Sequence, residues 1–154
     1  MKIKQIDLET LSVAKLPLGC VSKMIENDID SDFRSICYTL MTMANSGRND
    51  ALTLLFGIAY RNRNNYARMN NFVEAVSAFR HPEIIEFIAN EMMRVPSLPA
   101  TRTYLRTLLK ELLRINSDQS IHLLEELQND KRLGVRFRTR IKQYFEEPTN
   151  DYWD

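Results

Sequence analysis

The apolar residues of this chain recur at a spacing of 36 residues. Phe33, Met69, Leu105 and Ile141 stand at one position of this repeat. Equivalent positions hold these further sets: Ile36, Phe72, Leu108 and Tyr144; Cys37, Val73, Leu109 and Phe145; Leu40, Val76 and Leu112; and Met43, Phe79 and Ile115. Within each copy the apolar residues are three or four positions apart, which places them on one face of an α-helix. The chain is therefore constrained to form successive amphipathic helices that bury the same face.

A second helix is predicted after the first one in each copy. Proline is tolerated in the first turn of a helix but not in its interior, so Pro82 predicts the start of a helix. The aliphatic residues of the second helix recur too, although the first copy needs a three-residue slip in the loop containing Gly47, which costs little. The matching sets are Leu52, Leu54 and Leu55; Ile85, Phe87 and Ile88; and Ile121, Leu123 and Leu124. Each copy is thus predicted to be a helical hairpin.

The turn of the central hairpin reads Phe79-Arg80-His81-Pro82-Glu83-Ile84-Ile85. A first helix with an apolar ladder, a short turn, and a second helix that opens with a proline-acidic pair resembles the HEAT/armadillo class of helical repeats. Val135-Arg136 likewise resembles the valine-arginine start of bacterial members. Tetratricopeptide repeats are the nearest alternative, but their expected Trp, Gly and Tyr positions are missing here. The resemblance covers roughly residues 31–145 and implies an all-α fold, a short α-solenoid (superhelix) with one continuous core.

We expect a single HEAT-like domain over residues 1–147, made of about three and a half helical hairpins behind a helical N-terminal cap. Gly47 should end the first helix of the first hairpin. The expected segments are a cap at 1–30, hairpins at 31–62, 65–95 and 99–129, a final helix at 131–147, and a polar C-terminal tail at 148–154. Individual helices are expected over residues 32–45, 50–61, 101–115, 118–129 and 132–146.

The composition fits a helical globular protein. The chain has 154 residues, with four glycines and five prolines, and this length can bury a core without disulfide or metal support. Its longest apolar stretch, residues 52–60, is far shorter than a bilayer span, so we expect no membrane segment and a cytoplasmic location. Cys37 lies in an apolar column, which predicts a buried, inert thiol. Cys20 has no neighbouring cysteine or histidine with which to form a motif.

The fold resemblance implies a function in binding. In the HEAT class the second helices line the inner surface of the solenoid, so a protein partner is expected to contact their polar positions. This predicts a scaffold or interaction module that presents a stacked-helix face. The residues predicted to contact a partner are Tyr60, Arg61, Glu86, Asn90, Met93, His122, Glu126 and Asn129.

An alternative is nucleic-acid binding through a basic ridge. Residues 48–142 carry 16 basic and 10 acidic side chains, whereas residues 143–154 carry four acidic ones and no basic one. Arginines and lysines at i and i+4 form a stripe on one helix face, and stacking would set two such stripes side by side, where they could contact phosphates. The competing interpretation is a solvated face, paired locally with Glu111 or facing the acidic tail. The ridge residues are Arg102, Arg106, Lys110, Arg138 and Lys142.

The sequence favours a binding protein over an enzyme. It contains no glycine-rich phosphate loop, nucleophile elbow or paired-carboxylate motif, and we predict no catalytic residue. His122 and Glu126 are one helical turn apart, but a metal site needs three or four converging ligands. We therefore expect a surface pair, and neither a metal nor a cofactor. His81, before Pro82, is expected to form a hydrogen bond in a turn.

Overall fold

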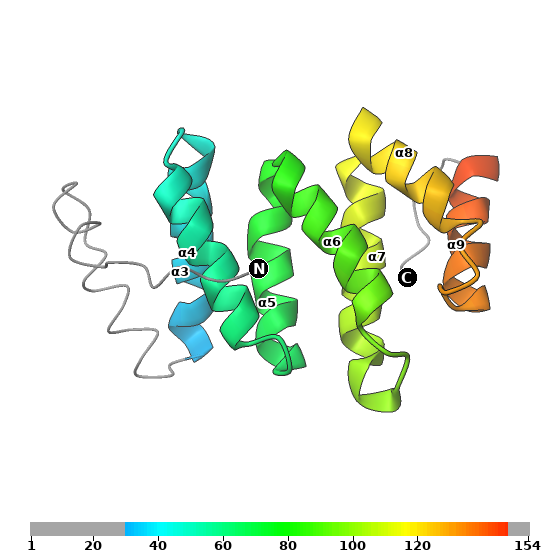
Figure 1. The fold of residues 1–154 in the computed structure, drawn as a ribbon, viewed down its shortest axis with the longest axis horizontal. Coiled ribbons are helices and arrows are strands. Elements are labelled where there is room, and N and C mark those ends of the chain that lie inside the picture. The colour runs from blue at the N-terminus through cyan, green and yellow to red at the C-terminus, as the bar shows by residue number, and fades with distance from the viewer. Residues whose placement is uncertain (1–29, 148–154) are drawn as a thin grey trace, which may run out of the picture. The chain divides into compact units, whose positions relative to one another are not determined.

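The computed structural model describes residues 30–147, which form seven α-helices and two short 3₁₀ helices (Figure 1). These residues contain no β-strand, so the predicted all-α class is confirmed. None of the helices within this range is long and apolar enough to cross a membrane. The predicted N-terminal cap, apart from Asp30, and the predicted tail at 148–154 lie outside the described residues, as does Cys20.

The chain divides into two compact units, Met1–Phe79 and Arg80–Asp154. The described part of the first unit comprises α3 (Asp30–Asn45), α4 (Asn49–Arg61), α5 (Tyr66–Val76) and the 3₁₀ helix η1 (Ser77–Phe79). In this unit α3 packs against both α4 and α5. The largest fully buried side chains in its core are those of Phe33, Leu40, Met41, Leu55, Met69 and Phe72.

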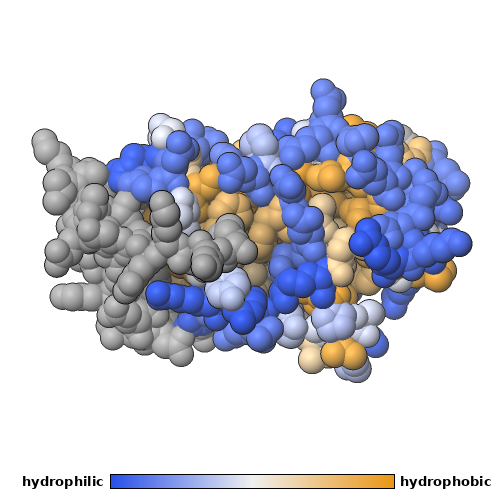
Figure 2. Space-filling model, in the orientation of Figure 1, coloured by the Kyte–Doolittle hydropathy of each residue, from blue (hydrophilic) through white to orange (hydrophobic). Residues whose placement is uncertain are grey.

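The second unit contains α6 (Pro82–Arg94), the 3₁₀ helix η2 (Pro99–Thr101), α7 (Arg102–Ile115), α8 (Asp118–Leu127) and α9 (Val135–Glu146). Its central element is α7, which packs against α6, α8 and α9. The core is again apolar, and its most deeply buried residues include Ile84, Ile85, Ile88, Tyr104, Leu108 and Leu112. On the face drawn in Figure 2, hydrophilic side chains cover most of the described surface and apolar ones are visible between them.

Four of the five apolar columns expected from the sequence are buried in α3, α5 and α7, whereas Met43 and Phe79 of the fifth are half-buried. Phe33, Met69, Leu105 and Ile141 are all at most 3% exposed. Burial weakens towards the carboxyl end of α9, where Tyr144 and Phe145 are half-buried although the matching residues in α5 and α7 are fully covered. Thus α9 contributes less to the core than the helices that precede it.

Three turns between helices share one backbone feature. The residue before the N-cap of the following helix has a positive φ at Gly47 (99°), Arg80 (53°) and Asn116 (47°). These three residues are equivalent when the second helices are aligned, because the loop of the first copy is three residues longer than in the other two. Positive φ favours glycine and, among other residues, asparagine, because a Cβ atom crowds the following carbonyl. Arg80 is therefore the residue that is least suited to this conformation.

Gly47 ends α3 as predicted from the sequence. Its N–H donates to the carbonyl of Ala44 (3.0 Å), and the N–H of Arg48 donates to the carbonyl of Met43 (3.1 Å). This pair of hydrogen bonds is the Schellman arrangement, which satisfies carbonyl groups that have no partner within the helix. The chain can then reverse direction and begin α4 at Asn49.

The second helix of each hairpin begins with a different capping contact. His81 precedes Pro82 and its Nδ1 accepts a hydrogen bond from the N–H of Glu83 (3.2 Å), so both the predicted helix start and the predicted turn hydrogen bond are confirmed. Ser117 accepts from the N–H of Ser120 (3.2 Å) at the start of α8. Both contacts satisfy a backbone donor that the helix itself leaves unpaired.

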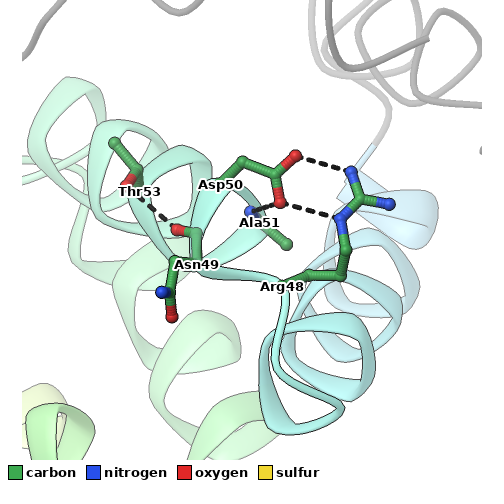
Figure 3. A network of polar contacts seen from close by, with 5 residues as sticks. All are labelled: Arg48, Asn49, Asp50, Ala51 and Thr53. Carbon is green, nitrogen blue, oxygen red and sulfur yellow. Dashed lines mark hydrogen bonds and ion pairs between the residues drawn. The ribbon is translucent and has the colours of Figure 1, made fainter. Parts of the chain in front are cut away.

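At α4 an ion pair takes the place of a side-chain cap. The guanidinium of Arg48 donates to the carboxylate of Asp50 (Nε to Oδ1, 2.9 Å), and Asp50 also accepts from the N–H of Ala51 (Figure 3). The hydrogen bond from Arg48 is the main reason that the pKa of Asp50 lies below its usual value. An ionised carboxylate in the first turn also interacts favourably with the positive end of the helix dipole.

Helix α9 begins later than the sequence analysis predicted. The expected start was residue 132, or 131 for the segment as a whole, but residues 131–134 form a turn and the helix begins at Val135. Asp130 accepts hydrogen bonds from the backbone N–H of Arg132 (2.9 Å) and from its guanidinium, which fixes a turn instead of a helical start. At the other hairpins the differences are smaller: α7 begins one residue late and α8 ends at Leu127 instead of Asn129.

The shared turn conformation predicts opposite effects of two substitutions on the free energy of unfolding. Gly47→Ala should destabilise by about 1 kcal/mol, because it places a Cβ at positive φ, although that Cβ would meet no neighbouring atom. Arg80→Gly should stabilise by about 0.5 kcal/mol, since it removes a left-handed strain of about 1–2 kcal/mol and adds a smaller entropic cost in the unfolded chain. Urea denaturation followed by circular dichroism measures both, and a loss of stability in Arg80→Gly would contradict the assigned conformation.

Candidate anion-binding site

A cavity of about 430 Å³ lies in the second unit between the amino-terminal halves of α7 and α9. Four arginines line it, and we call it the arginine pocket: Arg102 and Arg106 come from α7, and Arg136 and Arg140 from α9. Each pair is four residues apart, so each occupies one helix face with a rise of about 6 Å between its members. Two helices thus present cations to the same cavity.

The positive charges in the arginine pocket are crowded. The pKa of Arg140 is lowered, first because its side chain is partly removed from water, and then because the charges of Arg136 and Arg106 repel it. Within the described part of the chain, no carboxylate forms an ion pair with Arg102, Arg106 or Arg136. An anion entering this cavity would meet several guanidinium groups, which are suited to bidentate contacts with carboxylate or phosphate.

The turn before α7 directs its first residues into the arginine pocket. The hydroxyl of Thr101 donates to the carbonyl of Pro96 and accepts from the N–H of Leu98 (3.0 Å), which closes the loop before the helix. Arg102 follows directly and Ser97 also lines the cavity. The two prolines at residues 96 and 99 restrict the backbone here. The position of Arg102 is therefore fixed by a turn that prolines and hydrogen bonds of Thr101 hold in place.

Three contacts within the second unit position α9. The carbonyl oxygen of the Asn116 side chain accepts from the hydroxyl of Tyr144 (2.8 Å), which joins α9 to the end of α7. Ile141 is fully buried, and the Nε of Arg138 donates to the carbonyl of Leu133 (3.0 Å) at the start of the helix. Gly134, the N-cap of α9, has no side chain to cap the helix, and a Cβ added there would lie 3.7 Å from Cδ2 of Phe137. Gly134 and Val135 both line the cavity, so the amino terminus of α9 borders it.

Apolar side chains complete the lining of the arginine pocket. Leu105 forms part of the buried core, Phe137 is half-buried, and Val135 is 69% exposed. Val135 is one of the most exposed large apolar residues in the described chain. The cavity therefore combines four cations with apolar side chains from both α7 and α9.

The predicted basic ridge and the arginine pocket share only part of their residues. Arg102 and Arg106 belong to both. Arg138 and Lys142 were predicted to stand beside them, but neither lines the pocket, and Arg138 contacts the Leu133 carbonyl instead. Lys110 is half-buried on α7 and does not line it either. The sequence analysis missed Arg136 and Arg140, which have the same i, i+4 spacing as Arg102 and Arg106.

The residues predicted to contact a protein partner are surface residues on α4, α6 and α8 and at the turn after α8. Met93 is half-buried, and the other seven are exposed: Tyr60, Arg61, Glu86, Asn90, His122, Glu126 and Asn129. On α6 they are spaced at i, i+4 and i+7, and the same spacing recurs from His122 to Asn129. The three predicted residues of α6 therefore share one helix face, as do His122 and Glu126 on α8, whereas Asn129 lies in the turn that follows α8.

His122 and Glu126 form the surface pair that the sequence predicted. The Nε2 of His122 lies 3.3 Å from Oε1 of Glu126, and both side chains are more than 60% exposed. Across residues 30–147, no three His, Cys, Asp or Glu side chains are grouped so that they could hold a metal ion. The pair stabilises α8 as an ordinary i, i+4 contact.

Comparisons of the chain with known protein families, with curated proteins and with solved structures find no match.

The thiol of Cys37 is fully buried in α3, as its apolar column predicted, and burial raises its pKa to about 12, against a smaller opposing effect of the nearby Arg68 charge. At pH 8 only about one thiol in ten thousand would then be ionised. In a Cys20→Ser variant, Ellman's reagent should therefore label no thiol in native buffer and one thiol per chain in guanidinium chloride. Full labelling of the native protein within minutes would show that Cys37 is accessible.

Proposed function

We propose that this protein binds nucleic acid through the arginine pocket. The observation that carries the proposal is the convergence of Arg102, Arg106, Arg136 and Arg140 on one cavity. Arginines suit phosphate groups, because each guanidinium can donate two parallel hydrogen bonds to one phosphate. The pKa of Arg140 is lowered mainly by partial removal from water and further by the charges of Arg136 and Arg106, and an anionic ligand would offset that repulsion.

A HEAT-like α-solenoid is the architecture we propose for the chain. Two observations support it: the buried column formed by Phe33, Met69, Leu105 and Ile141, and the turns that place a positive φ at equivalent positions. In such a stack, neighbouring first helices lie side by side.

The proposal predicts which cations matter for binding. Arg102→Ala combined with Arg136→Ala should weaken binding of a fluorescein-labelled 20-nucleotide strand of mixed sequence by about tenfold or more at 50 mM NaCl, because two charged hydrogen-bonding groups are lost. The slope of log affinity against log salt should also become shallower, by about one for each phosphate contact removed. Fluorescence anisotropy titrations at several salt concentrations measure both quantities.

Lys142→Ala is the control for loss of a cation outside the arginine pocket, because Lys142 is exposed on α9 and does not line the pocket. Its affinity and salt slope should stay close to those of the unmodified protein. The proposal would be wrong if the strand did not bind at 50 mM NaCl, or if the double variant and the control bound equally well.

Binding of a protein partner is the second candidate function. What favours it is an exposed aromatic and cationic pair on α4 and the turn after it: Tyr60 is 49% exposed and the guanidinium carbon of Arg63 lies 4.2 Å from its ring centre. Tyrosine and arginine are the residues enriched at the centres of protein interfaces. In the second unit, the exposed polar positions of α6 and α8, among them Glu86 and Glu126, are available for partner contacts.

Reversing the charges of the predicted inner face tests this second candidate. Glu86→Lys combined with Glu126→Lys should release a partner that the unmodified protein retains from a nuclease-treated lysate of its source, while the melting temperature changes little because both side chains are exposed. Glu125→Lys, which reverses one charge at another exposed position of α8, is the control. Retention of the same partner by the double variant would remove this face from consideration.

A further inference from the structure

The apolar lining of the arginine pocket has no role in binding phosphate alone. Phosphate oxygens gain from guanidinium and backbone N–H groups, whereas Leu105, Val135 and Phe137 offer no hydrogen bond. Leaving Val135 69% exposed costs free energy unless a ligand covers it. The cavity therefore suits a ligand with an anionic part and a flat or apolar part.

The size of the cavity supports the same conclusion. Its volume of about 430 Å³ lies within the range of about 300–1,000 Å³ that is typical of sites for small organic ligands. A lone phosphate would leave much of this space unfilled. A nucleotide supplies both a phosphate and a base whose faces can stack on an aromatic ring.

We propose that the arginine pocket holds a single unstacked nucleotide, with its phosphate among the four arginines and its base against Phe137 and Val135. This inference rests on the proposed nucleic-acid function and specifies which form of nucleic acid is bound. The open amino terminus of α9, at Gly134 and Val135, adds partial positive charge on the side where the phosphate would lie.

A single strand meets this requirement more easily than a duplex. In a duplex the bases are paired and stacked, and extruding one of them into a pocket costs several kcal/mol. In a single strand the bases can splay outwards and stack on aromatic or guanidinium groups without that cost. A pocket for one unstacked nucleotide should therefore discriminate between the two forms even though both carry the same phosphates.

The test compares four probes by fluorescence anisotropy at one salt concentration: a labelled 12-nucleotide single strand, its duplex, a strand with abasic sites at its central positions, and unlabelled ATP as a competitor. The single strand should bind about tenfold more tightly than either the duplex or the abasic strand. Phe137→Leu should weaken binding of the single strand about tenfold and leave duplex binding unchanged. Phe145→Leu, which replaces another half-buried aromatic of α9 outside the pocket, should change neither.

The outcomes separate this inference from the proposed function. Equal binding of single strand, duplex and abasic strand, with Arg102→Ala/Arg136→Ala still impaired, would overturn the nucleotide pocket and leave nucleic-acid binding in place. Failure of every strand to bind would overturn both. Displacement of the single strand by micromolar ATP would support the nucleotide pocket and show that a free nucleotide can also occupy it. The abasic comparison uses the unmodified protein, so it stands even if Phe137→Leu does not fold.

Discussion

One helix in each unit carries most of the packing, and the other elements depend on it. In the first unit α3 packs against α4 and α5, and in the second unit α7 packs against α6, α8 and α9. A helix that is covered by several neighbours must be apolar over a wide arc, and eight residues of α7 are buried. What remains of its surface is a narrow stripe, which is where Arg102 and Arg106 lie. The candidate site is thus built on the most constrained helix of its unit.

A buried polar contact fixes α6 on α7. The carboxylate of Glu91 accepts from the hydroxyl of Tyr104 (2.7 Å) and from the guanidinium of Arg94 (2.7 and 2.9 Å), and both Glu91 and Tyr104 are buried. Burying a carboxylate is costly unless its oxygens are hydrogen-bonded. Because these bonds have direction, they select one arrangement of the two helices, which apolar contacts alone do less well.

Helix positions could be predicted from the sequence because they follow from local rules. Pro82 fixes a helix start, Gly47 a helix end, and the apolar spacing fixes which face is buried. The start of α9 could not be predicted in this way, because the contacts of Asp130 with the Arg132 side chain and N–H form a turn where the apolar pattern alone allowed a helix. Nor did the sequence reveal the three matching turns as positive-φ positions, since Arg80 is an unexpected residue there.

The arginines of the site show why a repeat in the sequence does not predict which residues line a pocket between two helices. A 36-residue shift relates Arg102 to Arg138 and Arg106 to Lys142, and related residues in stacked helices point in the same direction. A cavity between two helices is lined by opposite sides of them, so α7 contributes Arg102 and Arg106 whereas α9 contributes Arg136 and Arg140. A change of two positions turns a side chain about 200° around the helix axis. The sequence alone predicts the basic stripe on each helix, but which stripes face each other depends on how the helices pack.

The crowding of positive charge in the arginine pocket opposes the packing of α9, which is the most weakly packed helix of the second unit. Ile141 is the one buried residue of α9, whereas α7 has eight. Repulsion between Arg106 on α7 and Arg140 on α9 acts directly against the docking of these helices. Any anion that binds between them replaces this repulsion with attraction to both, and a ligand that binds the folded state alone stabilises it by mass action. Occupancy of the pocket and docking of α9 are therefore expected to be coupled, so that a ligand would stabilise the second unit through its most weakly packed helix.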